Sequence, residues 1–181
     1  KKTPGRNHDY TQKFGSEKIM TNTPAITMDD KAAILLEEAR AAHENYLIKQ
    51  QDADLEKAIE YYIDAIKVNP SISESYYRLA SLLLMKGQIS IEGALEQCQT
   101  ALTLEPNNVN AHIYSGYFQC LNGNFEEAEK EFKLAVSNSG KNSARPRLFL
   151  SKVLFSRIKN HDSSVKDVMK FLYYFLSGSM M

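Results

Sequence analysis

The side chains that could do chemistry are few in this chain, and they lie far apart in the sequence. None of the four histidines has a cysteine or carboxylate at the spacing of a metal site; they are His8, His43, His112 and His161. The two cysteines, Cys98 and Cys120, have no nearby base that would activate a thiolate. Because neither the histidines nor the cysteines form a metal-binding or reactive group, we expect no metal and no cofactor. The cysteines suit buried positions in a protein of a reducing compartment, so we expect a cytoplasmic location.

Catalytic sequence motifs are also missing. The sequence holds no glycine-rich phosphate loop, no G-x-S-x-G elbow and no H-E-x-x-H pair. Its paired acids are Asp29–Asp30, Glu37–Glu38 and Glu126–Glu127, which suit helix starts or solvated helix faces. We therefore predict that the chain is not an enzyme.

Composition and charge narrow the class of protein further. Of the 181 residues, 43% are hydrophobic and 24% are charged, which is typical of a folded domain. The 22 basic and 22 acidic residues cancel, so no overall field favours nucleic acid, and no apolar run is long enough to span a membrane. The charge is uneven, because residues 25–140 carry an acidic excess and residues 141–181 a basic one.

A threefold internal repeat dominates the sequence. Small or apolar residues recur at spacings of four and three, which place them on one face of a helix: Ala58, Tyr62 and Ala65, then Ala94, Cys98 and Ala101, then Ala128, Phe132 and Ala135. Corresponding positions lie 34 to 36 residues apart, and Pro70, Pro106 and Gly140 end each helix in turn. Alanine lets two helices approach closely, so these columns predict helices packed against neighbours.

A second helix precedes each of these helices after a turn. Residues 73–87 and 110–123 have helical periodicity and end at Gly87 and Gly123. Gly116, inside the second of them, indicates a facing helix that packs closely. The turn after Gly87 is two residues longer than its counterpart after Gly123.

Paired helices with this period resemble the tetratricopeptide repeat family. The resemblance rests on one unit with Leu79, Ala80, Gly87, Ala94, Ala101 and Pro106, and on a second with Gly116, Gly123, Phe125, Ala128, Phe132 and Ala135. It implies an all-α solenoid with three clear repeats and a degenerate C-terminal one. The expected helix pairs are 31–50/55–68, 73–86/92–104, 109–122/125–138 and 144–158/163–176. We expect a flexible polar tail over 1–27, the repeat domain over 28–176 and a tail or truncation point at 177–181.

The resemblance also implies a binding surface, because the first helices of such units line a concave groove. Family positions that face the ligand correspond to Glu74, Tyr77, Ser81, Leu84, Met85, Asn110, Ile113, Tyr117, Cys120, Leu121, Arg147, Ser151, Leu154 and Phe155. Tyr77, Met85, Tyr117 and Arg147 are the preferred anchors, since aromatic, methionine and arginine side chains suit interfaces. Leu84, Cys120 and Leu154 suit helix packing equally well.

The resemblance therefore predicts a non-catalytic scaffold that binds a peptide or helix of a partner protein. Arg145, Arg147 and Lys152 gather near the C-terminal end, so we expect a partly apolar ligand with acidic residues towards that end. Some family members clamp the C-terminal carboxylate of chaperones with lysine, asparagine and arginine, but the matching positions here hold Arg40, Glu44, Arg78, Asn110 and Tyr114. We expect that clamp to be absent. Two alternatives stay open: a regulatory or targeting segment of a larger protein, and a small secretion chaperone.

The C-terminal run Phe171–Leu176 is apolar on every side of a helix, whereas a terminal helix needs a polar outer face. It predicts a contact with a following helix of a longer protein, with a second copy in a homodimer, or with a membrane surface. The first is preferred, with dimerisation of the isolated chain as its consequence.

Overall fold

The chain is described here by a computed structural model, which covers residues 27–140 and 144–159, with side chains up to Val153. These residues form helices and no strand. The helices are α1 (Met28–Lys49), α2 (Asp52–Val68), α3 (Ser73–Met85), α4 (Ile91–Leu104), α5 (Val109–Leu121), α6 (Phe125–Asn138) and α7 (Ala144–Lys159). The all-α prediction is confirmed, and the helix boundaries fall within about three residues of those expected.

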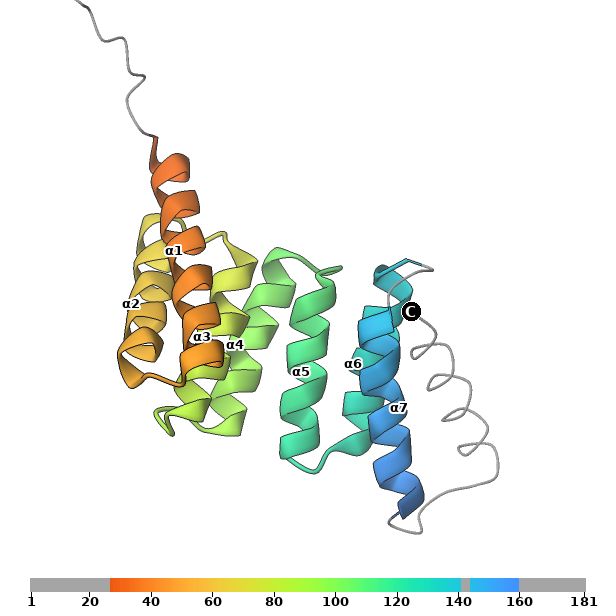
Figure 1. The fold of residues 1–181 in the computed structure, drawn as a ribbon. Helices are drawn as coiled ribbons and strands as arrows, with labels where there is room; N and C mark the ends of the chain where they lie inside the picture. The colour runs from red at the N-terminus through yellow and green to blue at the C-terminus, as the bar shows by residue number, and fades with distance from the viewer. Residues whose placement is uncertain (1–26, 141–143, 160–181) are drawn as a thin grey trace, which may run out of the picture.

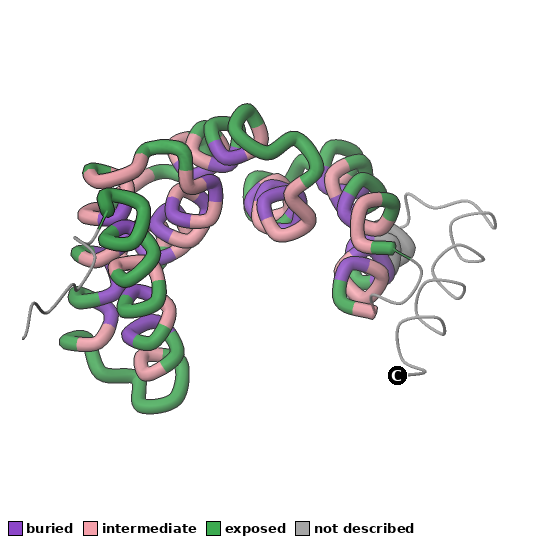
Figure 2. The backbone as a smooth tube through the Cα atoms, turned by 90° about the horizontal axis from the view of Figure 1, so that it is seen from above, coloured by how far each residue is buried: buried purple, intermediate pink, exposed green. Residues whose placement is uncertain are grey.

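The helices form antiparallel pairs that stack one after another (Figure 1). Each helix packs against its neighbours in sequence, α3 also contacts α5, and α5 contacts α7. Seen along the helices, the stack bends into an arch (Figure 2). Contacts between alternate helices place α3, α5 and α7 side by side, as expected for the first helices of successive units.

The repeated alanine columns form the helix contacts that their spacing predicts. All six alanines at positions 58, 65, 94, 101, 128 and 135 are 0% exposed. Three hydrophobic clusters follow one another along the stack, and each draws residues from three consecutive helices. The larger residues of the columns, Tyr62, Cys98 and Phe132, each belong to a different cluster. Each repeat unit is therefore stabilised by its neighbours rather than by a single central core.

Two glycines end the first helices of the second and third units in the same way. Gly87 and Gly123 have φ of +66° and +79°, a left-handed conformation that glycine adopts without a Cβ penalty. After each of them the next amide donates to a carbonyl five residues earlier: Gln88 N to Leu83 O at 2.9 Å and Asn124 N to Gln119 O at 2.9 Å. These bonds define a Schellman motif that satisfies the helix end. The turn is longer after Gly87 than after Gly123, as predicted.

The first helix begins earlier than its periodicity suggested. The Asp30 amide donates to the Thr27 hydroxyl at 3.1 Å, and the Thr27 amide donates to the Asp30 carboxylate at 3.0 Å. This capping box sets the start at Met28, three residues before the expected start. Residues 1–26 of the predicted tail, the predicted helix 163–176 with its dimer contact, and residues 177–181 lie outside the described residues.

Candidate functional site

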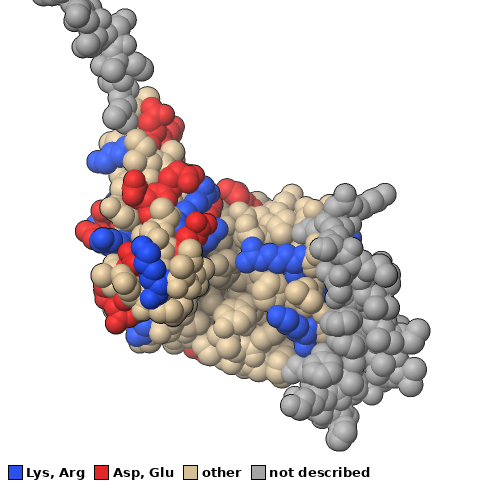
Figure 3. Space-filling model, viewed as in Figure 1, with Lys and Arg blue, Asp and Glu red and all other residues tan. Residues whose placement is uncertain are grey.

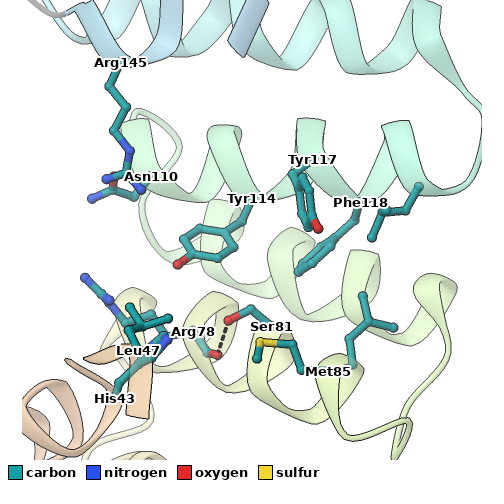
Figure 4. A pocket seen from close by; sticks show the side chains of 12 residues that line it. His43, Leu47, Arg78, Ser81, Met85, Asn110, Tyr114, Tyr117, Phe118 and Arg145 are labelled. Carbon is teal, nitrogen blue, oxygen red and sulfur yellow. Dashed lines mark hydrogen bonds between the residues drawn. The ribbon is translucent and has the colours of Figure 1, made fainter. Parts of the chain in front are cut away.

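A pocket of about 480 Å³ opens on the concave side, where the first helices of four units meet (Figure 4). We call it the groove. It is lined by His43 and Leu47 of α1, by Arg78, Ser81, Leu84 and Met85 of α3, by Asn110, Tyr114, Tyr117, Phe118 and Leu121 of α5, and by Arg145 of α7. The groove therefore depends on the stacking of all four units, and no single repeat could form it.

One end of the groove is polar and positively charged. Figure 4 shows the guanidinium of Arg145 reaching down from α7 to Asn110, while the guanidinium of Arg78 lies across the groove on the α3 side. The hydroxyl of Tyr114 points toward the same end. Within the described part of the chain, no ion pair involves Arg145.

Glu74 fixes Arg78 from the side of the first unit. The Nε of Arg78 lies 2.5 Å from Glu74 Oε1, and Arg40 of α1 donates to both oxygens of the same carboxylate, through Nε at 2.9 Å to Oε1 and through Nη2 to Oε2. Burial raises the pKa of Glu74, but the hydrogen bond from Arg40 and the charges of both arginines outweigh it and lower the pKa overall. Glu74 is thus an ionised carboxylate between two cations.

The other end of the groove is apolar and open to solvent. Met85, Tyr117 and Leu121 are 56%, 46% and 48% exposed, although large apolar side chains are usually covered. Tyr117 is supported from beneath by Phe118, which is fully buried and whose ring centroid lies 5.8 Å away. On the face drawn in Figure 3, acidic and basic side chains cluster over the α1–α2 end, and the surface over α3 and α5 is largely uncharged.

A second, smaller pocket continues the groove between α5, α6 and α7. It has a volume of about 290 Å³ and is almost entirely apolar, with Tyr117, Cys120, Phe125, Phe132, Phe149, Lys152 and Val153 as its lining. Two contacts involve its aromatic rings. Phe132 and Phe149 stack with their ring centroids 5.6 Å apart, and the Lys152 ammonium lies 5.6 Å from the centre of the Phe149 ring. Tyr117 lines both pockets and so stands between them.

Comparison with known proteins identifies this fold. A family model described as tetratricopeptide repeat matches residues 47–72, which span α2 and its flanking turns. The solved tetratricopeptide domain of Sgt2 from Aspergillus fumigatus superposes with a TM-score of 0.60 at 18% identity, covering 74% of this chain and 83% of that one. The described helices therefore form a solenoid with the fold of tetratricopeptide-repeat domains.

Two further tetratricopeptide domains were solved with ligands. The first such domain of Spaghetti (RPAP3), bound to the HSP90 peptide SRMEEVD, has a TM-score of 0.57 and 19% identity over 70% of this chain and 94% of that one. The TPR2B domain of yeast Sti1, in a complex with pHsp70, has a TM-score of 0.55 and 23% identity over 68% of this chain and 99% of that one. At these low identities the likeness shows a shared fold alone.

The solenoid brings together about half of the residues predicted for its groove. Ser81, Leu84, Met85, Asn110, Tyr117 and Leu121 all line it. Glu74 lies at its edge, held by Arg40 and Arg78. Cys120 lines the smaller pocket instead.

Two other predicted positions, Tyr77 and Ser151, are only 2% and 1% exposed, so their side chains are covered in this conformation. Ile113 is 4% exposed and lines a separate pocket of about 220 Å³ with Tyr114, Tyr117, Arg145 and Phe149. Tyr77 packs beneath Tyr114 with ring centroids 5.0 Å apart, and burial raises its pKa to about 12. Tyr77 therefore supports the groove from below, and the ring that lines it on α5 is Tyr114.

On α7 the groove residue is Arg145 rather than the predicted Arg147. Arg147 is half-buried and does not line the groove. The side chains of Leu154 and Phe155 lie outside the described residues.

Sequence reasoning missed the contribution of α1 and the exact register on α5. His43 and Leu47 were not predicted, because the first helix of the first unit lacks the alanine and glycine markers by which the other units align. A signal did exist. The groove-lining residues recur at spacings of three and four on α1, α3 and α5, such as Asn110, Tyr114, Tyr117 and Leu121 on α5.

The remaining polar side chains have structural roles. His112 is 6% exposed, its Nδ1 lies 2.8 Å from Glu131, and its Nε2 lies 3.0 Å from the Pro106 carbonyl, so it joins α5, α6 and the preceding turn. Burial raises the pKa of Cys98 to about 12 and of Cys120 to about 11, which keeps both thiols protonated. No cluster suited to a metal ion and no helix long and apolar enough to cross a membrane occurs among the residues described.

Proposed function

We propose that this solenoid is a non-catalytic interaction module that holds a peptide segment of a partner protein in the groove. The observation that carries the proposal is the exposed trio of Met85, Tyr117 and Leu121 at the open end of a 480 Å³ pocket. Pockets of that size, apolar with a few converging polar groups, suit ligand binding. A rigid aromatic ring and an adaptable methionine are side chains typical of interaction hot spots.

Relatives of the same fold support this proposal. The RPAP3 domain was solved with an HSP90 peptide, and the Sti1 domain in a complex with pHsp70. Here one of the positions that corresponds to the chaperone clamp, Arg40, is already engaged by Glu37 and Glu74. We therefore propose a peptide that differs from the chaperone tail in what it presents to α1. A cytoplasmic location remains a prediction from the cysteines alone.

Selection of peptides from a random library displayed on phage tests the proposal, with the purified chain as bait. The groove variant Met85→Ser/Tyr117→Ser should lose binding to the selected peptides by about thirtyfold or more, because even one hot-spot truncation costs roughly 2 kcal/mol or more. Leu104→Ser/Leu134→Ser is the matched control, since these side chains are 39% and 45% exposed on α4 and α6, outside the groove. Equal losses in both variants, with unchanged helicity, would contradict the proposal.

A further inference from the structure

Three pockets follow one another along the concave side, and the groove is the first of them. The second pocket, between α5, α6 and α7, shares Tyr117 with the groove. The pocket of about 220 Å³ that Ile113 lines shares Tyr117 with both, and Phe149 with the second pocket. A peptide that lies in the groove therefore has the second pocket directly beyond Tyr117.

We propose that the second pocket takes an aromatic side chain of the peptide whose neighbouring residues occupy the groove, so that the partner is selected by an aromatic anchor on the α7 side of Tyr117. This inference rests on the proposed function. It adds the chemistry of one side chain of the partner and the place where that side chain binds.

The volume of the second pocket suits an aromatic ring. An apolar cavity of roughly 150 Å³ is enough to hold a benzene molecule. The second pocket has about 290 Å³, which is room for a ring and for the methylene that joins it to a peptide backbone. A methyl or isopropyl group would leave much of that space unfilled, and unfilled space forfeits packing contacts.

The lining of the second pocket favours an apolar ring over a charged group. Four of its seven residues carry aromatic rings: Tyr117, Phe125, Phe132 and Phe149. Aromatic rings gain from offset or edge-to-face contacts beyond the area that they bury, and contacts between sulfur and a ring, as Cys120 could make, are also favourable. The charged member of the lining, Lys152, has its ammonium 5.6 Å from the centre of the Phe149 ring, where it would repel a cationic side chain of the partner.

The floor of the second pocket is already fixed in the free chain. Phe132 is 1% exposed, and its ring stacks on Phe149 with an interplanar angle of 10°. The same ring lies against α5 at Gly116, where a Cβ would be 2.9 Å from two of its atoms. Because these contacts hold the ring in place, little side-chain freedom is left to lose when a ligand binds, and a preorganised site binds more tightly.

The test uses a peptide selected on phage from a random library, with the purified chain as bait, and then synthesised with a fluorophore for anisotropy measurements. We expect the selected sequences to share an aromatic residue. Changing that residue to alanine should weaken binding about thirtyfold or more, as truncation of a hot spot does. Changing it to leucine should weaken binding several-fold, because the contacts between rings are lost.

Two substitutions at one position of the chain fill the second pocket or leave it open. Cys120→Phe places a ring of the chain itself in the pocket, so it should weaken binding of the selected peptide about thirtyfold, and the alanine change in the peptide should then add little to the loss. Cys120→Ala is the matched control and should bind the peptide almost as tightly as the parent chain. Circular dichroism and urea unfolding show whether both variants fold, and if Cys120→Phe does not, the peptide changes and the thiol reaction below decide the question.

The thiol of Cys120 reports whether the second pocket is occupied in the unsubstituted chain. Methyl methanethiosulfonate transfers a methylthio group to a thiolate, and mass spectrometry of the digested chain follows the reaction at each cysteine. Cys120 is half-buried and should react in the free chain, whereas Cys98 is fully buried and serves as the internal control. A saturating concentration of the selected peptide should slow the reaction of Cys120 about tenfold or more, because thiol reactivity requires access. The alanine-substituted peptide, also at saturation, should leave most of that reactivity in place.

The outcomes distinguish this inference from the proposed function. Failure to select any peptide that loses affinity for Met85→Ser would overturn both. Peptides that depend on Met85 but have no critical aromatic residue, or that bind Cys120→Phe as tightly as the parent chain, would overturn the aromatic anchor and leave the groove in place. A Cys120 thiol that reacts equally fast with and without the peptide, or that is as unreactive as Cys98 in the free chain, would also overturn it, because the second pocket would then be empty in the complex or closed in solution.

Discussion

Arg40 of α1 and Glu74 of α3 form an ion pair across 34 residues of sequence, and this pair ties the first repeat unit to the second. The Glu74 side chain is 18% exposed, so its charge depends on Arg40 and Arg78 for compensation. Glu74→Gln should lower the free energy of unfolding by about 1–3 kcal/mol, as for other partly buried charge-assisted bonds. Urea unfolding followed by circular dichroism measures the loss.

Glu37→Gln is a control for that variant, because Glu37 also contacts Arg40 but its side chain is 71% exposed. Exposed pairs contribute less than about 1 kcal/mol. Equal losses from the two variants would mean that Glu74 does not couple the units.

Because of the same ion pair, the stability of the folded chain should depend on pH in the acidic range. The pKa of Glu74 is lowered from its usual value of 4.5 in the folded protein, so its contribution to stability is complete above about pH 4.5. That contribution is lost as the pH falls through the lowered pKa. The stability difference between the parent chain and Glu74→Gln should therefore shrink below pH 4.5, and a difference that grows in acid would contradict the assignment.

The stabilisation from His112 should depend on pH in the opposite sense to that from Glu74. The hydrogen bond of His112 with Glu131 raises the pKa of His112 above 6.5, and its other ring nitrogen faces the Pro106 carbonyl. Both partners are acceptors, so the doubly protonated ring satisfies both contacts. The stabilisation is complete below about pH 6.5 and is lost as the pH rises through the raised pKa.

The stability difference between the parent chain and Glu131→Gln should thus be larger at pH 6 than at pH 9, measured by thermal unfolding at both values. Using this difference removes the contribution of His43, whose pKa is lowered and whose effect on stability has the opposite sign. A difference independent of pH would show that His112 stays neutral.

At Gly116 the helices α5 and α6 pack so closely that an added methyl group should destabilise the chain. A Cβ at this position would lie 2.9 Å from two atoms of the Phe132 ring, which is itself buried and stacked on Phe149. Gly116→Ala should therefore destabilise the chain by about 1–3 kcal/mol despite the better helix propensity of alanine.

Gly93→Ala provides the comparison, because its Cβ would find its nearest neighbours at 3.6 Å and 3.7 Å. It should gain up to about 1 kcal/mol from helix propensity. Gly116→Ala/Phe132→Leu should recover part of the loss if the ring is the obstacle. A stabilising Gly116→Ala would contradict the close approach of α5 and α6.

The fold was predictable because its determinants repeat. Ala58, Ala94 and Ala128 recur in register, and each sits where a larger side chain would separate two helices. Gly87 and Gly123 likewise recur where a left-handed residue must end a helix. Three copies of the same local constraint leave one architecture consistent with all of them.

The groove was less predictable, because helical spacing alone allows a stripe to step by three or by four residues. Tyr77 and Arg78 differ by one position, yet the first is 2% exposed in the core while the second lines the groove. The same ambiguity selected Ile113 for the groove in place of Tyr114, whereas Tyr114 lines the groove and Ile113 lines a smaller neighbouring pocket. Which neighbour is covered depends on how far the units rotate against each other, and that rotation is set by packing across the whole stack.

The central claim is that a partner segment binds on the concave side, between α3 and α5. Nuclear magnetic resonance measures this most directly, by titrating the isotope-labelled chain with a peptide selected as above. We predict that the Met85 methyl resonance and the signals of Tyr117 and Leu121 shift progressively and saturate together, while the signals of Leu104 and Leu134 on α4 and α6 stay unchanged. Saturating shifts confined to Leu104, Leu134 and their helices, with Met85 and Tyr117 unaffected, would contradict the account.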